Sequence, residues 1–245
     1  MTGFILGLTL RQLLFRKSTL LLLLLALLPV LIAVIFEVGN DGETAPEEFT
    51  VEVLCVWLVT TTVLPLTAVM FGTSVLGDEL EDGTIIYLLT KPVERWLILL
   101  PKIVAAWLLT TAFAVATMLV SVLIVMGGDG GSVMLGFGIA IAVGALAYAV
   151  VFTLLSIVTS RALIAGLIFV FIWEGAVTGI FEGVRYVSIR HYTLALAEWL
   201  SDVPTEYLDA YVGGITALIL SAAVIVGGSW YANQRLRRVE IREAT

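Results

Sequence analysis

The chain has very few of the residues on which most enzymes and nucleic-acid-binding proteins depend. Its 245 residues include one cysteine, Cys55, and one histidine, His191. A single thiol excludes an intramolecular disulfide framework and a cysteine-based zinc cluster, and a single imidazole excludes the usual His-rich metal and protease motifs. Only 13 residues are Lys or Arg, against 20 Asp or Glu. The formal net charge of −7 therefore excludes a strongly basic nucleic-acid binder.

Charge of either sign is also scarce, and apolar residues take its place. Charged residues make up 13% of the chain, whereas an average soluble domain carries about 25%. Hydrophobic residues reach 60%, with a mean hydropathy of +1.07. Such a composition excludes both an ordinary soluble surface and an intrinsically disordered chain. It predicts a protein that crosses a membrane several times.

Six long stretches with almost no charge predict six membrane-spanning helices. A hydrocarbon core of about 30 Å is crossed by about 20 helical residues, and every stretch suffices for one crossing. None alternates apolar and polar residues as the strands of a membrane barrel do. The expected spans are residues 18–36, 53–77, 103–127, 133–158, 162–181 and 210–231. We therefore expect a single all-α membrane domain over residues 1–245.

The distribution of charge predicts the orientation of these spans. With both termini in the cytosol, 11 of the 13 Lys and Arg residues lie inside, as positive-inside topology requires. Twelve acidic residues then lie outside and seven inside, so the acidic character belongs to the outer face. The first span is longer than the apolar core of a signal peptide, about 7–15 residues, and we expect it to be retained.

Short helices are predicted outside the spans. Residues 2–15 have the spacing of a helix lying in the cytosolic interface, with a simple extension of the first span as the alternative. The connection around Arg161 is so short that the fourth and fifth spans should form a hairpin. Between the fifth and sixth spans, we expect one or two short helices at the outer interface, half-buried by Tyr192, Trp199 and Tyr207.

The cytosolic connection Gly77–Lys102 has the most distinctive pattern. Four carboxylates crowd its start, Gly83 breaks the chain, Thr84 can cap a short helix through Leu89, and Pro92 begins the next helix. The short helix is apolar all round yet too short to cross a membrane, so it must bury its surface elsewhere. A groove in a second protein is the favoured place. The alternatives are the lipid headgroups or the chain's own bundle.

This connection resembles the cytosolic loop of type-2 ABC exporter permeases. The resemblance is greatest to the six-span bacterial permease that accompanies nitrous-oxide reductase maturation. Pro101 stands where such permeases commonly have Gly, and this departure should kink or restrain the base of the helix. The matching positions are Gly77, Glu79, Glu81, Gly83, Thr84, Leu88, Leu89, Thr90, Pro92, Arg95, Ile98, Leu99 and Lys102.

The resemblance implies a function and a set of partners. The chain would be the membrane subunit of an ABC transporter in a prokaryotic inner membrane, paired with a second copy of itself and two ATP-binding subunits. ATP and Mg²⁺ would be bound by those partners, and the work would be export of a molecule or force on an outer protein. A coupling helix at Thr84–Leu89 would sit in an ATPase groove. The residues implied in coupling are Glu79, Glu81, Gly83, Thr84, Ile85, Leu88, Leu89, Pro92, Arg95 and Lys102.

Polar side chains inside the predicted spans are few. Glu174, near the middle of the fifth span, would cost several kcal/mol in lipid unless it were paired, hydrated or neutral. It either lines a transport pathway or the seam of a dimer, or it is a hydrogen-bonded glutamate that packs two helices together. Several threonines should bond to carbonyls of their own helix. These are Thr60, Thr61, Thr62, Thr110 and Thr111.

The source of energy and the enzyme alternatives follow from missing motifs. The three lysines, Lys17, Lys91 and Lys102, do not follow the glycine pattern of a phosphate-binding loop, so energy must come from a partner or an ion gradient. An ATP-independent secondary transporter or channel is one alternative, although it would need more ionisable groups in the spans. A Mg²⁺-dependent transferase using the loop carboxylates is another, but a second acidic cluster on that side is missing. We expect no enzyme activity of the chain's own.

Overall fold

The computed structural model describes residues 2–14, 17–40, 42, 44–81, 95–208 and 210–242. Every regular element in these ranges is a helix, so the prediction of an all-α protein is confirmed for the part of the chain that the structure describes. The long helices are α2 (Lys17–Gly39), α4 (Leu64–Glu81), α6 (Trp96–Met126), α7 (Gly131–Val158) and α11 (Gly214–Arg242).

Shorter elements begin the chain, connect the long helices and complete the bundle. Two of them, η1 and η3, are π-helical, and η2 and η4 are 3₁₀ turns. The short elements are α1 (Thr2–Leu14), α3 (Pro46–Phe49), η1 (Thr50–Val63), η2 (Gly127–Gly130), α8 (Ala162–Ile168), η3 (Phe169–Val177), α9 (Thr178–Ile180), η4 (Glu182–Val187) and α10 (Ile189–Leu200).

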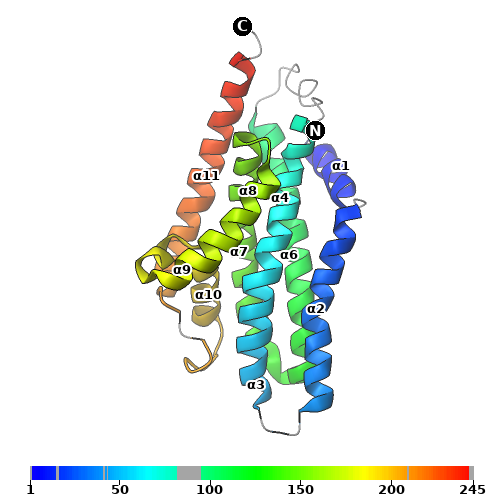
Figure 1. The fold of residues 1–245 in the computed structure, drawn as a ribbon, viewed down its shortest axis with the longest axis vertical. Helices are drawn as coiled ribbons and strands as arrows, with labels where there is room; N and C mark the ends of the chain where they lie inside the picture. The colour runs from blue at the N-terminus through cyan, green and yellow to red at the C-terminus, as the bar shows by residue number, and fades with distance from the viewer. Residues whose placement is uncertain are drawn as a thin grey trace.

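Five helical stretches of the described chain are long and apolar enough to cross a membrane. The third contains both α6 and α7, which the turn η2 folds back side by side (Figure 1). Several membrane-spanning helices are thus confirmed. The five stretches are Thr19–Gly39, Pro46–Gly77, Trp96–Val158, Ala162–Ile180 and Gly214–Leu236.

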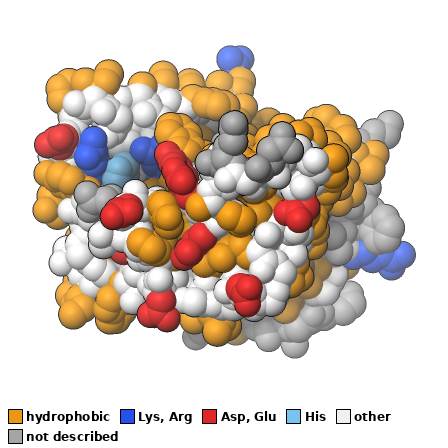
Figure 2. All heavy atoms as spheres, turned by 90° about the horizontal axis from the view of Figure 1, so that it is seen from below, with side chains coloured by type: hydrophobic (Ala, Val, Ile, Leu, Met, Phe, Trp, Pro, Cys, Tyr) orange, Lys and Arg blue, Asp and Glu red, His pale blue; other side chains and the backbone are white. Residues whose placement is uncertain are grey.

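The two ends of the bundle differ. Helix α1 and the last turns of α11 lie at one end, and α3 and the turn η2 lie at the other (Figure 1). Seen from this second end, the surface carries many carboxylates, with basic and imidazole side chains together near one edge (Figure 2). An acidic surface here is what the charge distribution of the sequence predicts for the outer face.

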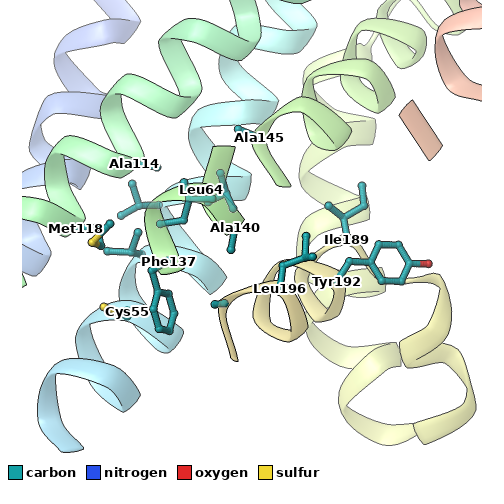
Figure 3. Packing of buried hydrophobic residues seen from close by; sticks show 14 of the residues in the cluster. Cys55, Leu64, Ala114, Met118, Phe137, Ala140, Ala145, Ile189, Tyr192 and Leu196 are labelled. Atoms are coloured by element: carbon teal, nitrogen blue, oxygen red, sulfur yellow. The ribbon is translucent and has the colours of Figure 1, made fainter. Parts of the chain in front are cut away.

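Helix α7 forms the centre of the bundle and packs against α4, α6, α10 and α11. Tyr148, Phe137 and Phe152 are its largest fully buried side chains. Figure 3 shows Phe137 and its neighbours on α7 between residues of α4 and α6 on one side and of α10 on the other. Helices α2 and α11 lie at the periphery, where Leu24 and Ile219 are 65% and 62% exposed. Such leucines and isoleucines suit contact with lipid.

Helix α6 begins at Trp96, seven residues before the predicted start of the third span at residue 103. The prediction started the span after the charge of Lys102, whose side chain is buried inside the bundle and hydrogen-bonded, and this boundary stays a prediction. The helix also continues through Pro101, which can deprive only one preceding carbonyl of its partner.

Helix α10 lies where the sequence predicted a short, half-buried helix after the fifth span. It packs along α7 and α11, and half of its twelve residues are buried. The approach to α7 is close because Gly136 and Gly144 present no side chain: a Cβ atom there would lie 2.6 Å from Ser201 Cβ and 2.2 Å from Thr193 Oγ1. Tyr192 is buried, and Trp199, at 53% exposed, is about half-buried.

Candidate functional site

The residues implied in coupling fall into two groups. Glu79 and Glu81 belong to the last turns of α4, and Arg95 occupies the N-cap position of α6. The expected coupling helix Thr84–Leu89 lies in the stretch 82–94, outside the described residues, as do Gly83 and Pro92. The structure therefore places the two helices that the loop connects, and the loop prediction itself stays a prediction.

Lys102 lies at the contact between these two helices. Its side chain is 1% exposed, and its Nζ donates a hydrogen bond to the carbonyl oxygen of Val75 on α4 at 2.8 Å. The ammonium therefore lies inside the bundle, and its expected contact with the headgroups or with the loop carboxylates stays a prediction. A buried charge of this kind ties α6 to α4, because leaving the ammonium without acceptors would cost several kcal/mol.

Glu174 lies in η3, and its carboxylate binds the first turn of α10. The side chain is 3% exposed. Its Oε2 accepts a hydrogen bond from the hydroxyl of Ser188, and its Oε1 accepts one from the backbone N–H of Ile189 at 2.9 Å. A carboxylate is favourable there because the N-terminus of a helix carries partial positive charge. These contacts are those of the packing alternative left open by the sequence.

Ser188 is the N-cap of α10, and it links Glu174 to His191. Its Oγ accepts from the backbone N–H of His191 at 3.3 Å and lies 2.9 Å from His191 Nδ1. Burial, and then the positive charges of Arg190 and Arg185, lower the pKa of His191 from 6.5 to about 4. The imidazole is therefore neutral at pH 7.

Two guanidinium groups converge on Thr178, one helical turn beyond Glu174. The Thr178 hydroxyl donates to the carbonyl oxygen of Glu174 at 2.7 Å and accepts from Arg190 Nη2 at 3.2 Å. Arg185 Nε donates to the carbonyl oxygen of Thr178, also at 3.2 Å, and its guanidinium lies 5.2 Å from the centre of the Tyr211 ring. Both arginines therefore donate a hydrogen bond to Thr178, one to its carbonyl oxygen and one to its hydroxyl.

A cavity of about 140 Å³ lies beside this cluster. Its polar wall includes Glu174 of η3, Arg190 of α10, Tyr148 of α7, and Thr61 and Thr62 of η1. Both π-helical segments of the described residues, η1 and η3, line it. Such wide helical turns are rare and occur frequently at functional sites. The cavity is smaller than typical drug-sized ligand pockets, about 300–1,000 Å³, and suits a small group.

Two groups that line this cavity have unused hydrogen-bonding capacity. The hydroxyl of Tyr148 is buried, as is the Nε of Arg190, and neither has a hydrogen-bond partner within the described part of the chain. Tyr148 is 0% exposed. Since buried polar groups are usually satisfied, two such groups around one cavity mark a place where a ligand or water can bind. No pattern in the sequence singled out Tyr148, which lies in a purely apolar stretch.

The prediction that five threonines bond to carbonyls of their own helix is confirmed for two of them and wrong for three. Thr61 and Thr62 donate to the carbonyl oxygens of Val56 and Trp57 at 2.8 and 3.0 Å, so the prediction of bonds within their own helix is confirmed for them. It is wrong for the remaining three, whose buried hydroxyls find no partner among the described residues. A helical threonine has two favoured χ1 rotamers, and only one of them directs the hydroxyl to a carbonyl of the preceding turn. These three are Thr60, Thr110 and Thr111.

Comparison with known proteins gives one match. No curated protein matches the chain. The model of one protein family, the ABC-2 family transporter proteins, matches residues 9–193, which run from α1 into α10 and include α4, the connection that follows it and α6. The narrower similarity to the permease of nitrous-oxide reductase maturation stays a prediction. Because the match covers well over half of the chain and agrees with its several apolar membrane-spanning helices, the protein belongs to the ABC-2 family of transporter membrane proteins.

Proposed function

We propose that this chain is the permease of an ABC transporter that uses ATP hydrolysed by a separate subunit. The observation that carries the proposal is the family match across α4, the connection to α6, and the rest of the bundle up to α10. The sequence supplies the second reason, since none of its three lysines belongs to a phosphate-binding loop. The working unit in this proposal is two copies of the chain with two ATP-binding subunits.

The proposed topology has six crossings with both termini in the cytosol of a prokaryotic cell. The third apolar stretch supplies two of the crossings because η2 reverses the chain between α6 and α7. An even number agrees with α1 and the end of α11 lying at the same end of the bundle (Figure 1). The positive-inside distribution of Lys and Arg assigns this end to the cytosol.

In the proposed mechanism, closure of the ATPase pair displaces the coupling helix Thr84–Leu89. Arg95, at the start of α6, would receive this displacement from the loop, and Glu79 and Glu81 would act electrostatically where α4 ends. The hydrogen bond from Lys102 to Val75 supports the next step, since it joins α4 to α6 and would favour their movement together. The bundle would then change access from one side to the other or transmit force to an outer protein.

Purification from the native membrane tests the proposal. We expect an ATP-binding subunit in one-to-one ratio with the chain, and an activity that requires ATP. Leu88→Asp should abolish this co-purification, because a charge would enter the docked apolar face. Leu200→Asp, an identical change at a 40% exposed leucine at the end of α10, is the matched control and should retain the partner.

Three results would contradict the proposal. One is unchanged co-purification and ATP-dependent activity in Leu88→Asp. Another is transport that follows a proton or sodium gradient without ATP, which would identify a secondary transporter. The last is Mg²⁺-dependent turnover of lipid by the isolated chain, which would identify a transferase.

A further inference from the structure

The unused groups around the cavity are hydrogen-bond donors. Arg190 Nε is donor only, and neither it nor the Tyr148 hydroxyl makes a hydrogen bond of good geometry within the described chain, although the Glu174 carboxylate lies near that hydroxyl. Thr61 and Thr62 have already given their protons to helix carbonyls, and both oxygens of Glu174 already accept hydrogen bonds. The open positions therefore favour a ligand that accepts hydrogen bonds, rather than a metal cation that would need free carboxylate oxygens.

The local charge also favours an anion. Arg185 and Arg190 contribute two positive charges around Thr178, and Glu174 contributes one negative charge. The carboxylate of Glu174 is further compensated by the N–H of Ile189 at the N-terminus of α10. His191 adds no charge at neutral pH, since its pKa lies near 4. The site thus carries a net charge of about +1, in surroundings where an unpaired charge is costly.

The remaining wall of the cavity is apolar and reaches the flank of the bundle. Pro65, Leu66 and Val170 line it together with Phe171, which is 63% exposed. Next to Phe171 along the same flank, Ile168 and Ile172 are 53% and 54% exposed. A molecule whose head group lies between Tyr148 and Arg190 could therefore lay an alkyl chain against α8 and η3.

We propose that this cavity binds an oxyanion head group, a carboxylate or a phosphate, carried by an amphiphile with an alkyl chain. Tyr148 Oη and Arg190 Nε donate to the head group, and the alkyl chain lies along the exposed face of α8 and η3. The binding deepens the proposed function, as it gives the chemical class of a cargo, but the binding itself requires neither ATP nor an ATPase.

A competition experiment on the full chain in dodecyl maltoside, a neutral detergent, tests this site. Radiolabelled dodecyl phosphate is bound to the purified chain and displaced with unlabelled dodecyl phosphate, dodecanoate, dodecanol or inorganic phosphate. We expect both amphiphilic anions to displace the label and dodecanol to fail. Failure of inorganic phosphate assigns the head group to a lipid-like molecule. Displacement by inorganic phosphate at the same concentrations supports the oxyanion site but assigns it to a soluble anion.

Tyr148→Phe is the decisive variant because it removes only an oxygen that has no partner in the described chain. We expect it to weaken dodecyl phosphate binding about tenfold, as loss of a hydrogen bond to a charged group does. Arg190→Gln should weaken it at least as much. Tyr231→Phe, a 46% exposed tyrosine of α11, is the matched control and should bind like the unaltered chain.

Equal affinity of Tyr148→Phe and Tyr231→Phe, or equal displacement by dodecanol, would overturn the proposed site. This result is independent of the ATPase test. The binding experiment contains no nucleotide and no partner, whereas the proposed function is decided by co-purification and ATP dependence. Failure of one therefore leaves the other standing.

Discussion

Glu174 illustrates how a charge is accommodated at the scale of one residue. Its two oxygens satisfy Ser188 and the N–H of Ile189, so the first turn of α10 depends on this carboxylate. Glu174→Leu leaves both donors without an acceptor, and we expect it to lower the free energy of unfolding by roughly 1–3 kcal/mol. Thermal unfolding of the purified chain measures this as a lower Tm.

Glu174→Gln is the matched control, because the amide oxygen can still accept from Ile189. Its Tm should lie between those of the unaltered chain and the Leu variant. Equal Tm values for Gln and Leu would contradict a role in holding α10. Full ATP-dependent activity and an unchanged substrate range in the Gln variant would show that transport does not need the negative charge of Glu174, which leaves this side chain a role in packing.

His191 predicts a dependence of stability on pH. Its pKa is about 4 in the folded chain, because burial and two arginines disfavour the imidazolium, and 6.5 when unperturbed. Between these values the unfolded chain binds a proton that the folded chain does not, so the folded state loses stability as pH falls from about 6.5 towards 4. His191→Asn should remove this contribution. The test compares the fall in Tm from pH 7 to pH 5 in the unaltered chain and in His191→Asn. An equal fall in the two proteins would refute the contribution of His191.

The sequence shows that a charged residue lies in a span, but it does not show which groups form hydrogen bonds with that charge. Glu174 was recognisable because it interrupts an apolar stretch, yet Ser188 and Ile189 lie 14 and 15 residues further along. Lys102 shows the same limit: its charge suggested where a span begins, but not that it would bond to a carbonyl 27 residues earlier. Side-chain partners of this kind depend on how the helices pack, which hydropathy does not encode.

At the scale of whole elements, the contact between α7 and α10 depends on two glycines. A Cβ at Gly136 would lie 2.8 Å from the backbone nitrogen of Ser201 and 2.9 Å from its Cα, and backbone cannot move aside as a flexible side chain can. We expect Gly136→Ala to destabilise the chain by about 1–3 kcal/mol through overpacking. The measurement is Tm in detergent.

Gly138→Ala supplies the comparison, two residues further along the same helix. Its added Cβ would meet only Met118 Cε at 3.7 Å, an ordinary van der Waals contact. This variant should be as stable as the unaltered chain, or slightly more so since alanine favours helix. Equal loss in the two variants would mean that the tight contact with α10 is not what makes Gly136 necessary.

The existence of the spanning helices was predictable, because each depends on a long apolar run with almost no charge. The stretch Thr19–Gly39, for example, agrees closely with the predicted span 18–36. The docking of α10 was not, since glycines are common in membrane helices and neither Gly136 nor Gly144 stands out by position. The π-helical turns that shape the cavity were also beyond sequence reasoning, because their wider spacing leaves composition unchanged.

At the scale of the molecule, the positive-inside rule and the fold lead to one arrangement in the membrane. The turn η2 joins α6 to α7 at one end, and the connection around Ser160 joins α7 to α8 at the other. If both termini are cytosolic, η2 must face outward and Ser160 inward. Asp129 in η2 and Ser160 are both exposed, so each is a suitable position for a labelling probe.

The native background suits a cysteine-accessibility test, because Cys55 is the one cysteine of the chain and is 0% exposed. In intact bacterial cells, a membrane-impermeant maleimide should label Asp129→Cys, whereas Ser160→Cys should react only after permeabilisation. The unaltered chain should remain unlabelled in both conditions. Since α7 spans 28 residues, about 42 Å at 1.5 Å per residue, its two ends cannot both be reached from one side of a bilayer if it crosses. Labelling of Ser160→Cys alone in intact cells would reverse the orientation, and labelling of both would remove α7 from the set of crossings.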